Sequence, residues 1–214
     1  MFSREFSFAE GGEGIRLSAG DYYDESKGYG FLGLAAQERA ADRFTGTGGW
    51  NPRETYCPGD GEEAGLWQDG ADGVEVKAGF PLRFRAAVPG NGSYAVTVTI
   101  RGGREGAQGL MLYTGRRNLI KRDIVIWPGE VFSCRFYVRV CEYIPVVGEG
   151  AKEDNSVYVT VLGAGKSSAR ISGLKIEDAQ APTVFIAGDS LVADYDGLYP
   201  VSYTHLRAHE TKAN

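Results

Sequence analysis

The chain has 214 residues, of which 43% are hydrophobic and 24% are charged, and its formal net charge is −5. These values are typical of a folded globular protein and exclude a disordered chain. The negative charge gives no basis for nucleic acid or an anionic membrane as a partner. No apolar run reaches the eighteen residues of a membrane span. Residues 1–6 show no basic segment followed by an apolar core, so we expect no secretory signal and a cytoplasmic location.

Strand patterns dominate the chain from its start to about residue 177, with two exceptions near the beginning. The alanine-rich segment 32–43, with its interspersed charges, predicts a helix. Residues 44–70 are rich in glycine and contain Trp50 and Trp67, which predicts a long loop over the rest of the domain.

The clearest strand is 93–101, where Tyr94, Val96, Val98 and Ile100 alternate with polar or small residues. A turn signal, Asn-Gly, comes directly before it, so we expect 80–88 to pair with 93–101 as a hairpin. The same alternation predicts strands at 134–140 and 157–161, and the ranges 109–113, 119–127 and 171–177 are further candidates. Short strands with one apolar face, separated by glycine and proline turns, predict an antiparallel β-sandwich over residues 1–180.

Three cysteines, Cys57, Cys134 and Cys141, have no spacing typical of metal ligands. Cys134 and Cys141 lie at the two ends of one predicted strand and cannot form a disulfide if that strand is straight. We therefore expect buried, reduced thiols.

Residues 178–182 form the predicted linker to a second domain, because Pro182 favours an extended entry into the next segment. Residues 184–187 then read as a buried parallel strand, and Gly188-Asp189-Ser190 breaks it before an expected helix. A serine at such a turn is exposed at the sheet edge, and its N–H can join an oxyanion hole. The alternative is a plain loop in which Asp189 or Ser190 caps the helix.

Residues 183–195 resemble the first sequence block of the GDSL, or SGNH, hydrolases, and residues 181–190 resemble the junction between the sandwich and the catalytic domain of two-domain members. Residues 22–31, which end in Gly-Tyr-Gly-Phe, resemble the opening of two-domain bacterial rhamnogalacturonan acetylesterases. Residues 92–98 are similar to a strand in the sandwich of those enzymes. In that family a galactose-binding-like sandwich precedes the hydrolase domain, so the resemblance covers most of the chain.

The resemblance implies that Ser190 is the nucleophile and one oxyanion donor, and that Gly188 and Asp189 shape the turn. The other oxyanion donors of the family, and its Asp-x-x-His, have no counterpart here. Residues 181–200 are therefore expected to be the start of a truncated hydrolase domain. The parent would be a carboxylic ester hydrolase that removes acetyl groups from pectic oligosaccharides, and we expect this chain to be inactive. This mechanism implies no metal or organic cofactor.

The only histidines, His205 and His209, lie in the segment 201–214. Residues 201–211 match the translation of a transposase adapter used in sequencing libraries, so we interpret 201–214 as an adapter-derived tail. This interpretation is preferred over a catalytic base for Ser190 and over a metal site at i, i+4 spacing.

The aromatic residues Trp50, Trp67, Tyr22, Tyr23 and Tyr29 form either a stacking platform for a sugar ring or ordinary packing.

Arg116 and Arg117 are candidates for clamping a uronate carboxylate, or belong to a solvated turn. The paired acids Glu62 with Glu63, and Asp21 with Asp24, are interpreted as surface residues.

Two alternatives to the esterase hypothesis remain open. The sandwich is either a non-catalytic carbohydrate-binding module or only an interaction domain, and a glycan array would separate them. The expected partner is an acetylated oligosaccharide, with no nucleic acid and no membrane.

Overall fold

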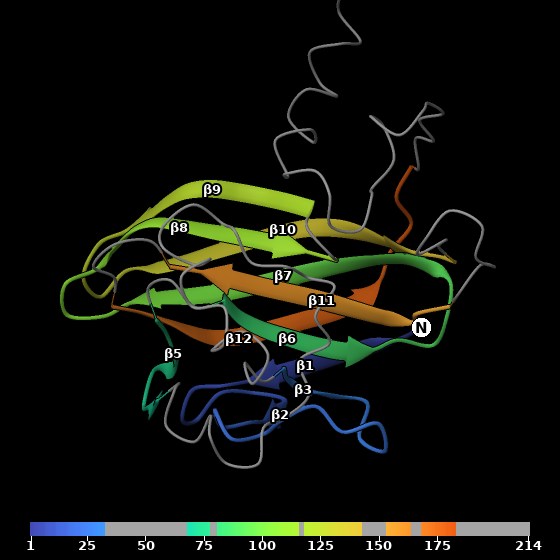
Figure 1. The fold of residues 1–214 in the computed structure, drawn as a ribbon, viewed down its shortest axis with the longest axis horizontal. Helices are drawn as coiled ribbons and strands as arrows, with labels where there is room; N and C mark the ends of the chain where they lie inside the picture. Colours follow the sequence, from blue (N-terminus) through green and yellow to red (C-terminus); the bar gives the residue numbers. More distant parts are fainter. Residues whose placement is uncertain (33–67, 78–80, 116–117, 143–152, 164–167, 183–214) are drawn as a thin grey trace, which may run out of the picture.

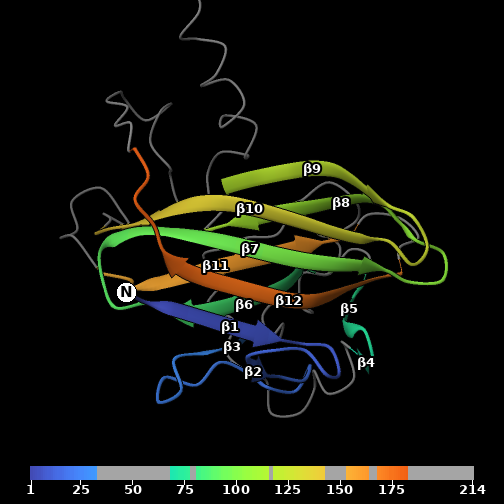
Figure 2. The same cartoon turned by 180° about the vertical axis from the view of Figure 1, so that it is seen from behind.

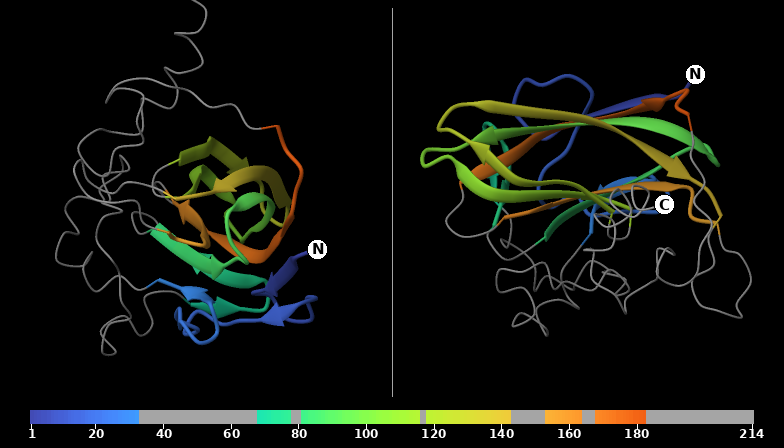
Figure 3. Two further views of the ribbon diagram at one scale, coloured as in Figure 1. Left: turned by 90° about the vertical axis from the view of Figure 1, so that its right-hand side faces the viewer. Right: turned by 90° about the horizontal axis from the view of Figure 1, so that it is seen from above.

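The computed structural model describes residues 1–32, 68–77, 81–115, 118–142, 153–163 and 168–182. Every regular element in these ranges is a β-strand, and the strands form two sheets that face each other (Figures 1 and 3). The predicted β-sandwich is therefore confirmed. Among the described residues, no helix is long and apolar enough to cross a membrane.

The larger sheet has seven strands, five of them in the order β10-β7-β12-β1-β2, and β5 and β4 extend it beside β12. Its pairs are antiparallel except for β1 with β2, which is parallel. The strands are β1 (Ser3–Ser7), β2 (Ile15–Arg16), β4 (Asp69–Gly70), β5 (Gly73–Val76), β7 (Gly92–Gly102), β10 (Val131–Val140) and β12 (Ala169–Asp178).

The smaller sheet has five antiparallel strands in the order β3-β6-β11-β8-β9. Figure 1 shows most of this sheet in front, and Figure 2 shows the larger sheet in front. The strands are β3 (Tyr29–Phe31), β6 (Pro81–Ala87), β8 (Ala107–Thr114), β9 (Asn118–Ile126) and β11 (Ser156–Leu162).

The core lies between the two sheets and is built by the alternation seen in the sequence. Tyr94, Val96, Val98 and Ile100 of β7 are each at most 3% exposed. One end of the core is aromatic, because four phenylalanine rings pack with centroids 5.0–5.4 Å apart. They are Phe6, Phe8, Phe31 and Phe84. Such tilted and edge-on contacts are favourable for aromatic rings beyond the area that they bury.

The predicted hairpin between 80–88 and 93–101 is wrong. β6 pairs with β3 and β11 in the smaller sheet, whereas β7 pairs with β10 and β12 in the larger one. The two strands are consecutive, but their apolar faces meet across the core instead of lying side by side. The Tyr94 hydroxyl donates to the Gly90 carbonyl over 2.7 Å and holds the corner where the chain changes sheets.

The expectation of buried thiols also needs correction. Cys134 is partly buried and Cys141 is exposed, and both are free. Cys141 follows β10, so the apolar alternation that buries the strand residues no longer applies to it. Burial raises the pKa of the Cys134 thiol. Cys57, the predicted helix 32–43 and most of the loop 44–70 lie outside the described residues.

Candidate functional site

The residues expected to carry catalysis lie outside the described part of the chain. This holds for Gly188, Asp189 and Ser190, for both histidines of the tail, and for all of residues 183–214. The tryptophans at 50 and 67, the arginines at 116 and 117, and the acid pair 62–63 are also outside it. Their roles remain predictions.

Three tyrosines of the expected stacking platform are described, and each packs against other side chains. The Tyr29 ring packs against Phe6 with centroids 5.2 Å apart, and Tyr22 packs against the core. Tyr23 instead lies under the guanidinium of Arg85, whose carbon is 4.3 Å from the ring centroid. Tyr22 and Tyr29 are thus partly buried against the core, and a stacking role for these tyrosines remains a prediction.

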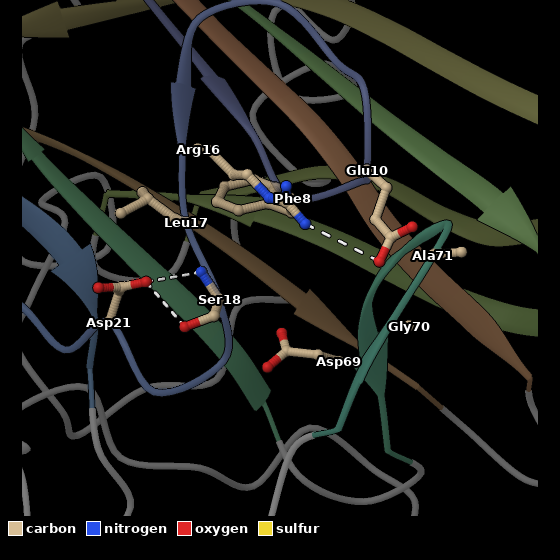
Figure 4. A pocket seen from close by; sticks show the side chains of 9 residues that line it. All are labelled: Phe8, Glu10, Arg16, Leu17, Ser18, Asp21, Asp69, Gly70 and Ala71. Carbon is tan, nitrogen blue, oxygen red and sulfur yellow. Dashed lines mark hydrogen bonds and ion pairs between the residues drawn. The ribbon is translucent and has the colours of Figure 1, made fainter.

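A pocket of about 490 Å³ lies at one edge of the larger sheet (Figure 4). Its walls come from the connection between β1 and β2, from the segment after β2, and from the β4–β5 hairpin. We call it the edge pocket, and it is lined by Phe8, Glu10, Arg16, Leu17, Ser18, Asp21, Asp69, Gly70 and Ala71. Its volume falls within the range of small-molecule sites, roughly 300–1,000 Å³.

Two carboxylates of the edge pocket are held in place by backbone N–H groups. Asp21 Oδ2 accepts from the Ser18 N–H over 2.6 Å and from the Ser18 hydroxyl over 2.8 Å. Asp69 Oδ1 accepts from the Ala19 N–H over 2.7 Å, which ties β4 to the segment after β2. Among the described residues, each carboxylate makes these bonds through one oxygen, and its second oxygen can accept from other donors.

The remaining polar side chains of the edge pocket are Glu10 and Arg16, whose charged atoms are 3.9 Å apart. Both side chains are largely exposed, so this ion pair contributes little to stability. With three carboxylates and one guanidinium, the pocket carries a net negative charge. Phe8 and Leu17 are buried and supply apolar wall.

A second polar cluster lies on the outer side of the smaller sheet. Arg83 and Arg85 of β6 lie over the Tyr158 ring, with guanidinium carbons 4.7 and 5.5 Å from its centroid. Asp154 accepts from the Tyr158 hydroxyl over 2.7 Å and pairs with Arg85 over 3.3 Å. Burial, and then the Asp154 carboxylate, raises the pKa of Tyr158 above its usual range. Because the guanidinium groups lie over the tyrosine rings, this cluster is a packing network more than an open site.

The described residues contain no group of three or more His, Cys, Asp or Glu side chains that could hold a metal ion. The polar side chains of the edge pocket offer hydrogen bonds and ionic contacts. Its carboxylates accept hydrogen bonds, its guanidinium donates them, and its concave shape limits the size of the ligand.

Sequence reasoning misses the edge pocket. Asp69 lies in a segment whose composition predicts a loop, and the sequence presents Asp21 only as a surface residue. One partial signal is present: Asp72-Gly73 is a dipeptide typical of hairpin turns, although the two loop residues here are Ala71 and Asp72. It can predict the β4–β5 hairpin, but not that Asp69 meets Ala19, fifty positions earlier in the chain.

Neither a family model nor a curated protein matches the sequence. Among solved structures, protein YxiM from Bacillus subtilis is similar at 22% identity over 83% of this chain, with a TM-score of 0.45. This chain spans 40% of the length of YxiM. A family 35 carbohydrate binding module from Clostridium thermocellum is 12% identical, covering 46% of this chain and 70% of the module, with a TM-score of 0.30. A family 35 module from an environmental isolate is also 12% identical, covering 54% of this chain and 79% of the module, with a TM-score of 0.34.

Proposed function

We propose that the β-sandwich is a non-catalytic carbohydrate-binding module whose edge pocket holds a neutral sugar. The observation that carries this proposal is the pair of anchored carboxylates, Asp21 and Asp69, on the wall of a concave pocket. Because backbone N–H groups already fix both carboxylates, little conformational freedom is lost when a ligand binds.

Sugar hydroxyls suit this pocket chemically. A hydroxyl that donates to a carboxylate forms a short, charge-assisted hydrogen bond, and a sugar offers several hydroxyls at once. Arg16 can donate to a ring or hydroxyl oxygen on the same ligand. Phe8 and Leu17 line the pocket but are almost fully buried, so they add only a small apolar area for the C–H groups of the ring.

The charge of the edge pocket favours a neutral ligand. A uronate would bring a carboxylate close to those of Glu10, Asp21 and Asp69, and like charges at short range repel. The pocket therefore differs from the pair Arg116 and Arg117, which are candidates for a uronate clamp.

The test is calorimetric titration of the full chain with neutral oligosaccharides of galactose and rhamnose. We expect measurable binding that Asp69→Asn weakens by about tenfold, since a charge-assisted hydrogen bond becomes a neutral one. Asparagine keeps an oxygen that can accept from Ala19, so the β4 contact is retained. Asp72→Asn is the matched control, because it removes the same charge from the exposed turn next to the pocket. Equal binding by both variants, or no binding by the wild type, would contradict the proposal.

We further propose that the longer protein is a carbohydrate esterase acting on acetylated pectic oligosaccharides, with Ser190 as nucleophile. This second proposal rests on the strand, turn and serine motif at 184–190 and on the family resemblance. A serine hydroxyl needs a base, and no Asp-x-x-His follows Ser190 in the sequence.

We expect this chain to hydrolyse aryl acetates no faster than its Ser190→Ala variant. Release of the aryl alcohol, followed by absorbance in both proteins, gives the comparison. A rate that depends on Ser190 would show that the chain holds a base that the sequence does not reveal.

A further inference from the structure

The outer face of the larger sheet, which is in front in Figure 2, carries more basic than acidic side chains. Strand pairing places on this face the basic residues Arg101, Arg135, Arg139, Arg170 and Lys175, and the acidic residues Glu5, Glu75 and Glu177. The whole chain, by contrast, has a net charge of −5. Positive charge is thus concentrated on one face of an acidic protein, and such a face attracts anionic ligands.

Three side chains of β10 form a line on this face, Arg135, Tyr137 and Arg139, which we call the basic row. They alternate with Phe136 and Val138, which pack with the core. All three members of the basic row are accessible, and Tyr137 is 57% exposed. A strand rises about 3.4 Å per residue, so the two arginines are roughly 13–14 Å apart with the tyrosine between them.

The neighbouring strand β7 presents only small side chains beside the basic row. On β7, Thr97 pairs with Arg135, Ala95 pairs with Tyr137, and Ser93 pairs with Arg139. No bulky side chain of β7 therefore shields the guanidinium groups or the tyrosine ring from a ligand that lies along β10.

At one end the basic row borders a hollow of about 470 Å³, lined by Ser93, Arg139 and residues 179–182. Arg139 Nη1 donates to the Ser93 hydroxyl over 3.4 Å, and no carboxylate of the described residues forms an ion pair with it. Arg135, by contrast, pairs with Glu177 over 2.8 Å. Arg139 therefore has the greater capacity to bind an added anion.

We propose that the basic row and this hollow bind a carboxylate-bearing oligosaccharide. One carboxylate of the ligand would bind Arg139, and a second would lie near Arg135. A guanidinium matches a carboxylate with two parallel hydrogen bonds, and the Tyr137 ring offers an apolar face to the sugar between them. The basic-row proposal shares with the proposed function only the assumption that the ligand is a carbohydrate. It uses none of the edge-pocket residues.

The position of the hollow also relates this site to the predicted nucleophile. Residues 179–182 line it, and Ser190 follows Pro182 by eight positions in the sequence. Eight residues span at most roughly 28 Å when fully extended. A ligand on Arg139 would thus lie beside residues 179–182, which precede the predicted nucleophile in the sequence.

The experiment titrates the full chain with an oligogalacturonide and with its fully methyl-esterified form, which has the same sugars without the charges. We expect the ester to bind at least about tenfold more weakly than the acid. Arg139→Gln should weaken binding of the acid by about tenfold, because a hydrogen-bonded charge pair is lost. Arg122→Gln is the matched control, since Arg122 is an exposed arginine on β9 of the other sheet, and it should bind as the wild type does.

Equal binding of acid and ester would overturn the proposal, and so would an equal loss in Arg122→Gln. A DNA oligonucleotide that binds as tightly as the oligogalacturonide would show a nonspecific polyanion surface and would also overturn it. Asp69→Asn separates the two sites. If neutral sugars fail to bind but Arg139→Gln still weakens the acid, the edge-pocket function fails and the basic row stands. If acid binding depends on Asp69 instead of Arg139, the basic-row proposal fails.

Discussion

Tyr158 lies in a partly buried environment next to one carboxylate and two guanidinium groups. Its hydroxyl donates to Asp154 over 2.7 Å, while Arg83 and Arg85 lie over its ring. The tyrosinate form would lose its hydration and would lie next to the Asp154 carboxylate. Both effects raise the pKa of the phenol in the folded state above its usual value near 10.

This pKa shift predicts a loss of stability at alkaline pH. Below pH 10 the phenol is neutral in both states, so its contribution to stability is complete. Above pH 10 the unfolded chain ionises and the folded chain does not, which favours unfolding. Between pH 8 and pH 11, the wild type should therefore lose about 1 kcal/mol more free energy of unfolding than Tyr158→Phe, as measured by urea denaturation.

The same variant should lower the free energy of unfolding at pH 8 by about 1 kcal/mol, because Asp154 loses a partly buried hydrogen-bond donor. Tyr137→Phe is the matched control: it removes the same atom from an exposed ring and should change neither quantity. If the free energy of unfolding depends on pH in the same way in the two variants, Tyr158 is not the cause of the alkaline loss of stability.

The strand β3 shows how one glycine fixes the place of a whole element. Gly30 lies between Tyr29 and Phe31, with a φ of 148°, and a Cβ there would overlap the backbone of Tyr22 and Tyr23. The preceding loop can lie beside β3 only because position 30 has no side chain. The Gly-Tyr-Gly-Phe segment is thus explained by close backbone packing at its second glycine.

We expect Gly30→Ala to lower the free energy of unfolding by about 3 kcal/mol or more, because both the φ and the overlap are unfavourable. Gly11→Ala is the control. Gly11 also has a positive φ, 69°, but beyond its chain neighbours no atom lies within 4 Å of the Cβ that alanine would add. That change should cost about 1 kcal/mol. Equal losses in the two variants, measured by chemical denaturation, would show that the contact with Tyr22 and Tyr23 is not the cause.

Strands can be predicted from the sequence where apolar and polar residues alternate over many positions. Such alternation locates β7, β10 and β11 and assigns the buried faces of all three correctly. Alternation tells which face of a strand is buried, but not which sheet the strand joins, and so the sequence pairs β6 with the wrong neighbour. Two-residue strands such as β2 and β4 are too short to show any period.

The candidate sites are less predictable than the strands, because they depend on contacts between distant positions. Asp69 meets Ala19 across fifty residues, and the β7–β10 pairing brings Ser93 to Arg139 across forty-six. The Arg-Tyr-Arg alternation at 135–139 is visible in the sequence. Only the folded chain shows that these residues lie on the outer face of the larger sheet, next to a hollow at the end of β12.

At the scale of the whole molecule, opposite charges occupy different places on one sandwich. The edge pocket presents Glu10, Asp21 and Asp69, whereas the basic row lies on the outer face of the same sheet. Carboxylates suit the hydroxyls of a neutral sugar, and guanidinium groups suit the carboxylate of an acidic one. A polysaccharide that contains both kinds of sugar could therefore use both sites.

The most direct test of the central claim, that this sandwich binds carbohydrate in its edge pocket, is mapping by NMR. A ¹⁵N-labelled chain is titrated with the neutral oligosaccharide that binds most tightly in calorimetry, and the backbone amide shifts are followed. We predict that the largest changes fall on Ser18, Ala19 and Gly70, with little change along β9. Changes that are absent, or that are spread evenly over both sheets, would contradict the claim.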